Sequence, residues 1–137
     1  MRIAKCVFVL GTAMVLSAVT VASAAAAHDP CRVLTAGAFS KVMGYAATID
    51  KTASTEMVCY YSGPDEGGGG QFRILTEAAS GPQADAMVNR KGSAPPAGSG
   101  MVGGTYKEGA IIFSLAIKST DHSKVDELVA EIKRNLK

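Results

Sequence analysis

Three cysteines, at positions 6, 31 and 59, are the residues of this sequence with the clearest chemical potential. A pair of cysteines can form a disulfide, act as a redox pair or ligate a metal ion. Cys31 and Cys59 do not form a C-x-x-C motif, and no cysteine–histidine cluster lies at ligand spacing. Because Cys6 lies in a segment that we expect to be removed, the sequence predicts one structural disulfide, Cys31–Cys59, which would contribute about 3–4 kcal/mol to stability.

The two histidines are the other side chains suited to catalysis near neutral pH. His28 lies at the expected start of the mature chain, and His122 follows Asp121 in the cap of a predicted helix. Neither has an evident nucleophile or orienting carboxylate in the sequence, although a Ser-His-Asp arrangement assembles only in space. We therefore predict no catalytic residue and keep a small secreted hydrolase as the alternative.

Residues 98–103 spell G-x-G-x-x-G, the pattern of a dinucleotide-binding turn. That turn follows a strand and opens a helix, whereas here a proline-rich loop precedes the pattern and a predicted strand follows it. Asp65 and Glu66 lie beside glycines but lack the oxygen ligands that an EF-hand spreads over about twelve residues. The sequence predicts neither a cofactor nor a metal site.

Tyr60 and Tyr61 are adjacent in a predicted strand, so their side chains must point to opposite faces of the sheet. One of them therefore belongs to the core. The other is either an ordinary surface aromatic or part of a binding surface.

Residues 1–27 have the organisation of an export signal. Arg2 and Lys5 precede an uncharged apolar stretch that ends in alanine-rich A-x-A cleavage sites. Such a signal would deliver the protein to the bacterial periplasm or the medium, where disulfides form. An uncleaved anchor is the alternative, since the apolar run nearly reaches the length that spans a bilayer. We predict cleavage and no stable membrane anchor afterwards.

The mature chain is formally neutral. Loss of Arg2 and Lys5 reduces the 14 basic residues to 12, which equals the number of acidic residues. A neutral domain without a basic stripe is a poor candidate for binding nucleic acid. Residues 28–137 are enough for a single domain.

Hydrophobic periodicity and turn residues predict the order α-β-β-β-α-β-β-α. This order favours an α+β fold, in which helices pack on a single twisted and mainly antiparallel sheet. Four consecutive glycines lead us to exclude 63–70 from regular structure. The predicted elements are a helix over 34–44, strands over 45–49, 55–62 and 71–76, a helix over 80–92 with a basic last turn, strands over 101–106 and 110–117, and a helix over 119–136.

Chain direction places two loops, 63–70 and 93–100, at the same edge of this sheet as the start of the last helix. Loops held on a rigid scaffold often bind ligands, and helix N-termini favour anionic groups. We therefore predict a binding edge, with tolerated loop insertions as the alternative interpretation. Its candidate residues are Asp65, Glu66, Ser119, Thr120, Asp121 and His122.

The segment Asp29-Pro30-Cys31-Arg32-Val33-Leu34-Thr35, with Cys59 beside Tyr60, resembles a family of small exported bacterial proteins of unknown function. Their mature domains start with Asp-Pro-Cys-x-Leu-Leu-Thr, and Val33 stands where that pattern usually has leucine. The resemblance implies a Mog1/PsbP-like fold and no established catalytic residues. This chain lacks the lipidation cysteine common in that family.

Together these patterns predict a periplasmic or secreted, non-enzymatic binding or interaction module. Its partner would be an unidentified protein or small molecule of the cell envelope. The alternatives are the small hydrolase named above and a structural envelope protein.

Processing of the leader can be checked directly. We expect the exported protein to start between Ala25 and His28, because the A-x-A sites end there. Intact-mass measurement of the exported protein tests this, and retention of residues 1–20 would contradict it.

Overall fold

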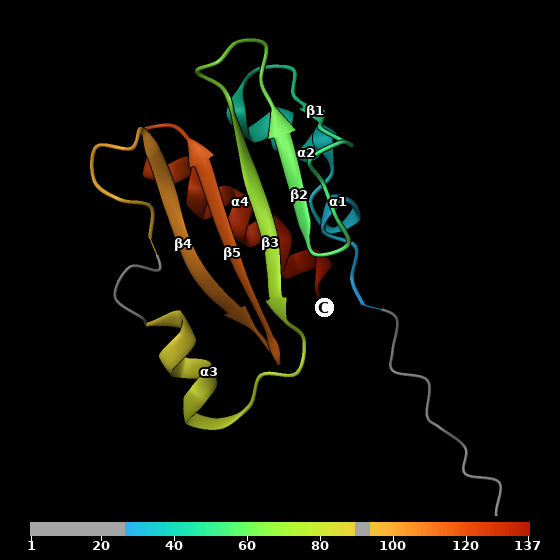
Figure 1. The fold of residues 1–137 in the computed structure, drawn as a ribbon, viewed down its shortest axis with the longest axis vertical. Coiled ribbons are helices and arrows are strands. Elements are labelled where there is room, and N and C mark those ends of the chain that lie inside the picture. The colour runs from blue at the N-terminus through green and yellow to red at the C-terminus, as the bar shows by residue number, and fades with distance from the viewer. Residues whose placement is uncertain (1–26, 90–93) are drawn as a thin grey trace, which may run out of the picture.

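The computed structural model describes residues 27–89 and 94–137 (Figure 1). The leader predicted for 1–27 therefore lies outside the described residues, except for Ala27. The basic helix end predicted at 90–92 lies outside them as well.

A single sheet of five antiparallel strands forms the scaffold, in the order β1-β2-β3-β5-β4 (Figure 1). Each strand joins the sheet antiparallel to its neighbours, and the predicted α+β class and element order are confirmed. The strands are β1 Thr48–Ile49, β2 Val58–Ser62, β3 Gly69–Thr76, β4 Met101–Glu108 and β5 Ile111–Lys118.

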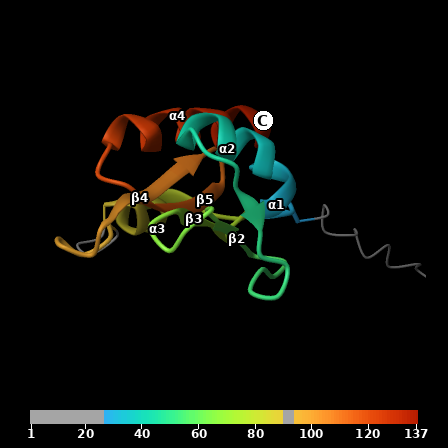
Figure 2. The same ribbon diagram turned by 90° about the horizontal axis from the view of Figure 1, so that it is seen from above.

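The helices are divided unequally between the two faces of the sheet (Figure 2). Three of them, α1, α2 and α4, lie on one face, whereas α3 contacts β4 and β5 from the other side. The helix predicted over 34–44 is α2, which begins two residues later because Leu34 and Thr35 are extended, and the short α1 ahead of it was not predicted. The helices are α1 Pro30–Val33, α2 Ala36–Met43, α3 Gly81–Val88 and α4 His122–Asn135.

Local capping explains where α2 begins and ends. The Thr35 hydroxyl accepts a hydrogen bond from the backbone N–H of Ala38 at 3.2 Å, and Gly44 ends the helix in the left-handed conformation with φ 80°. Threonine at the N-cap and glycine just after the last turn are common signals for the start and end of a helix. An N-cap of this kind contributes about 1 kcal/mol.

The core lies between the sheet and the three helices on its covered face. Tyr61 stacks on Phe39 of α2 with a ring-centroid distance of 4.3 Å, and its hydroxyl donates a hydrogen bond to the Leu34 carbonyl. The apolar stripe of α4 is buried as its spacing predicted. The strand residues of this core are Cys59, Tyr61, Phe72, Ile74, Ile111, Phe113, Leu115 and Ile117.

The Cys31–Cys59 disulfide is present, with a Cα–Cα distance of 5.1 Å. Cys59 is fully buried on β2, and Cys31 is half-buried. The sequence had placed Cys31 ahead of the first helix. In the structure Cys31 lies within α1. The bond therefore ties α1 directly to the sheet.

The exclusion of residues 63–70 from regular structure is wrong at its end, because Gly69 and Gly70 belong to β3. Each glycine fits because β3 lies very close to its neighbours there. Gly69 has φ 117°, and a Cβ at Gly70 would lie 2.7 Å from the Ala116 carbonyl oxygen. Ordering a glycine in a strand costs conformational entropy, and the close packing of the strands at Gly69 and Gly70 offsets that cost.

The strand predicted over 45–49 is shorter in the structure and contains only Thr48 and Ile49. Tyr45 lies before it, and its hydroxyl accepts a hydrogen bond from the backbone N–H of Gly69 at 2.7 Å. The side chain thus fastens the β2–β3 loop, a role that alternation alone does not reveal. Among the described residues, no helix combines the length and apolar character needed to cross a membrane.

Replacing Gly70 with alanine should destabilise the fold by about 1–3 kcal/mol, because the new methyl group overpacks the β3–β5 contact. Gly37→Ala is the matched control. Its Cβ would have only the Thr35 hydroxyl oxygen nearby, at 4.0 Å, and alanine favours a helix by up to about 1 kcal/mol. Urea unfolding midpoints measure both changes, and equal midpoints for the two variants would contradict the close approach.

Candidate binding groove on the open face of the sheet

The face of the sheet opposite α4 is only partly covered. At its lower end α3 packs on it, where Ala84 and Ile112 are both buried and Lys107 lies 3.5 Å from the Asp85 carboxylate. Above α3, alternate residues of β2, β3 and β5 face outward, including half-buried Tyr60 and Gln71 and exposed Arg73. This uncovered surface is the open face.

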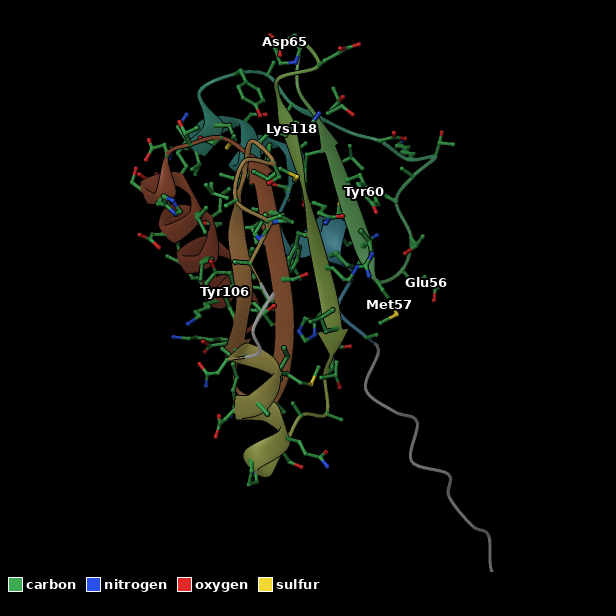
Figure 3. The ribbon with its side chains drawn as sticks, turned by 60° about the vertical axis from the view of Figure 1, so that its left-hand side comes forward. Glu56, Met57, Tyr60, Asp65, Tyr106 and Lys118 are labelled. Atoms are coloured by element: carbon green, nitrogen blue, oxygen red, sulfur yellow. A yellow bond between two sulfur atoms is a disulfide. The ribbon has the colours of Figure 1, made fainter. Side chains whose placement is uncertain are left out.

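Two adjoining depressions on the open face share Ala53 and Tyr60 and together form one groove along β2. Their volumes are about 480 Å³ and 380 Å³. Figure 3 shows Asp65 and Lys118 toward one end of β2, Tyr60 beside the strand, and Met57 toward the other end. We call this feature the binding groove, with its upper end at Asp65 and its lower end at Met57.

The loop before β2 forms one wall of the binding groove and is fixed by hydrogen bonds. The backbone N–H of Tyr60 donates to the Ser54 hydroxyl at 2.9 Å, and the N–H of Asp50 donates to the Tyr60 carbonyl at 2.9 Å. The Asp50 carboxylate in turn accepts from the N–H groups of Thr52 and Ala53. The wall is therefore held in place before any ligand arrives.

The floor of the groove carries polar groups that the fold itself leaves unused. Tyr60 and Gln71 are directly paired across β2 and β3, and Arg73 follows two residues later on the same face. Within the described part of the chain, the phenol, amide and guanidinium of these three residues make no hydrogen bond or ion pair. They can therefore bind a ligand without breaking an internal contact.

Charge is distributed unevenly along the groove. Three acidic residues, Asp50, Asp65 and Glu66, line its upper part, whereas Arg73 lines the lower part. Lys118 also lies at the upper end, where its ammonium donates to the Glu66 carbonyl at 2.8 Å. The two ends of the groove therefore differ in the ligand charge that they favour.

A second depression, of about 560 Å³, lies beside the binding groove and shares Met101 with it. The loop residues 94–98 line one side, and Ser119, Thr120 and His122 line the other. Asp121 is not among its lining residues and caps α4 instead, accepting from the backbone N–H of Ser123 at 2.9 Å. Hydrogen bonds from the Ser123 hydroxyl and backbone lower the pKa of the Asp121 carboxyl.

The predicted edge residues therefore fall into three groups. Asp65 and Glu66 lie at the mouth of the binding groove, Ser119, Thr120 and His122 line the second depression, and Asp121 serves the helix. Sequence reasoning missed Gln71, Arg73 and Lys118. Strand alternation could have found the first two, because they alternate with buried Phe72 and Ile74.

The two adjacent tyrosines are separated as alternation required. Tyr61 is 4% exposed in the core, and its burial, with a smaller effect of the Asp29 carboxylate, raises the pKa of its hydroxyl. Tyr60 lies half-buried in the groove. Tyr60 is therefore the outward tyrosine, and it lies among residues that line a depression.

His28 and Glu77, outside the groove, are partners of each other. The backbone N–H of His28 donates to both Glu77 carboxylate oxygens, at 3.1 and 3.2 Å, and its ring contacts the same carboxylate. Partial burial acts to raise the pKa of Glu77, but the hydrogen bonds from His28 outweigh it and lower the pKa. No group of three or more histidine, cysteine, aspartate or glutamate side chains within 27–89 and 94–137 could hold a metal ion.

No family model, curated protein or solved structure matches this chain. The functional argument therefore depends on the geometry and chemistry of its own surface.

The hydrogen bond between Ser54 and the Tyr60 backbone generates a test of the fixed wall. Ser54→Ala should speed amide hydrogen exchange at Tyr60 and cost about 1 kcal/mol of stability, since a single hydrogen bond is lost. Ser62→Ala is the control, because Ser62 is exposed and lies on β2, the strand that contains Tyr60. Unchanged protection of the Tyr60 amide in Ser54→Ala would show that the Ser54 hydrogen bond does not hold the wall.

Proposed function

We propose that this protein is an exported binding or interaction module of the bacterial cell envelope and that the binding groove is its capture site. The observation that carries the proposal is the fixed groove on the open face, where the side chains of Tyr60, Gln71 and Arg73 make no hydrogen bond or ion pair with any other described residue. Tyr60 and Gln71 are half-buried and Arg73 is exposed, so water can satisfy their polar groups in the free protein and a ligand can replace that water. Groups left unused in a depression are consequently suited to a ligand.

The proposed location, periplasmic or secreted, is supported by two features. The sequence of residues 1–27 is typical of a cleaved export signal. The Cys31–Cys59 disulfide is of the kind that persists in an oxidising compartment. The sequence resemblance to small exported bacterial proteins is consistent with the same proposal.

The hydrogen bonds made by the carboxylates in the groove favour a binding function over hydrolysis. A general base must be within hydrogen-bond reach of the proton that it removes. Asp50 and Asp65 each accept hydrogen bonds from backbone N–H groups of their own turns. Both carboxylates thereby stabilise the walls of the groove, which is a structural role rather than that of a general base.

A photo-crosslinking amino acid at position 71 tests the proposal in cells. We expect it to give a discrete adduct with an envelope component, and Tyr60→Ala in the same chain should reduce the yield by at least about fivefold, as removal of about 1 kcal/mol of aromatic contact predicts. The matched control carries the crosslinker at Gln83, an exposed residue of α3 outside the groove. Mass spectrometry of the adducts identifies the partner.

Two results would contradict the proposed site. Equal adducts from positions 71 and 83 would show contact without selection by the groove. An adduct obtained only when the crosslinker replaces Thr120 would move the site to the second depression.

A further inference from the structure

We propose that the binding groove takes an extended peptide segment that carries a positive charge at one end and a negative charge about four residues away. This inference rests on the proposed binding function and names the ligand class of the same site. Three observations carry it: the length of the groove, the unused polar groups along its floor, and the opposite charges at its ends.

The groove has the length of a short extended segment. It follows β2 from Ser62, at its upper end, to Val58, at its lower end. β2 has five residues, and a strand rises by about 3.3 Å per residue, so the groove is about 17 Å long. A peptide of about five extended residues spans that distance.

The middle of the groove offers partners for a peptide backbone. The Gln71 amide can both donate and accept hydrogen bonds, as can the Tyr60 hydroxyl, and the two residues are paired directly across the strands. An extended segment presents alternating N–H and C=O groups with the same dual requirement. Apolar contacts come from Met57, which is 53% exposed, and from Met101. Methionine adapts to side chains of varied shape.

The charges at the ends define the peptide's polarity. The exposed guanidinium of Arg73 lies at the lower end, opposite Val58 of β2, and favours a carboxylate of the peptide. Asp65 and Glu66 lie at the upper end and favour an ammonium or guanidinium, while Asp50 lies beside Tyr60 in the middle of the groove. Lys118, whose ammonium donates to the Glu66 carbonyl there, offsets one of these negative charges and leaves the upper end net negative.

A neutral saccharide is the principal competing ligand, since Tyr60 could stack on a sugar ring. It would leave the separated charges at the two ends without partners. A peptide uses the ends as well as the middle of the groove, and the charge pattern therefore favours the peptide.

Three acetylated and amidated pentapeptides test the inference by NMR amide-shift titration of the purified, oxidised protein. Their sequences are Lys-Thr-Leu-Thr-Asp, Lys-Thr-Leu-Thr-Lys and Asp-Thr-Leu-Thr-Asp. We expect the first to bind tightest and to shift the amides of Tyr60, Gln71 and Arg73. Each wrong end should weaken binding by about three- to fivefold, the size of an exposed ion pair.

Charge reversal at Arg73 provides the decisive comparison. In Arg73→Glu we expect the order of the first two peptides to reverse, so that the lysine-ended peptide binds tighter than the aspartate-ended one. Lys41→Glu makes the same change of charge on α2, on the covered side of the sheet, and should leave the order unchanged. Reversal of preference is a readout that simple destabilisation of the fold does not produce.

Several outcomes would overturn the peptide assignment. These are equal binding of all three peptides, unchanged order in Arg73→Glu, and tighter binding of a neutral chitohexaose that depends on Tyr60. Self-association that fills the groove, seen as a concentration-dependent change in mass by light scattering, would also overturn it. If crosslinking at position 71 still requires Tyr60 in these cases, the proposed binding function stands and only the ligand class is wrong.

Discussion

The central physical constraint on this protein is the unequal supply of apolar helical surface to the two faces of one sheet. The apolar stripes of α2 and α4 cover most of one face, and Phe39, Tyr61 and Leu128 are buried there. On the other face the eight-residue α3 buries Ala84 and packs mainly on β4 and β5. The free energy gained by burial grows with the apolar area removed from water. The short α3 removes little of it, so part of the second face stays open to other contacts.

Covalent and hydrogen-bonded ties fix this asymmetric arrangement. The Cys31–Cys59 disulfide holds the short α1, which has too few residues to be stable by itself, against β2. Tyr45 fastens the β2–β3 loop through the N–H of Gly69. As a result, the strand that lines the binding groove is supported from the covered face, and its loops are anchored at both ends.

Alternation along β2 and β3 allows the same segments to serve stability and binding. Cys59 and Tyr61 face the core, whereas Tyr60 between them faces the groove. Likewise Phe72 is fully buried, and its neighbours Gln71 and Arg73 face outward. A rigid strand has an ordered backbone before any ligand binds, so ordering of that backbone adds no entropic cost to binding. The proposed site is therefore built on the scaffold rather than on loops alone.

The sequence by itself determined the features that depend on local periodicity and simple counting. It predicted the Cys31–Cys59 bond, the opposite directions of Tyr60 and Tyr61, the helix stripe of α4 and the α+β order. Only the tertiary structure decided that β5 lies between β3 and β4, that Gly69 and Gly70 are in a strand, and that Asp50, Arg73 and Lys118 line one groove. Periodicity reports which face of an element is buried, whereas strand order and close backbone approach arise from contacts between residues far apart in the chain.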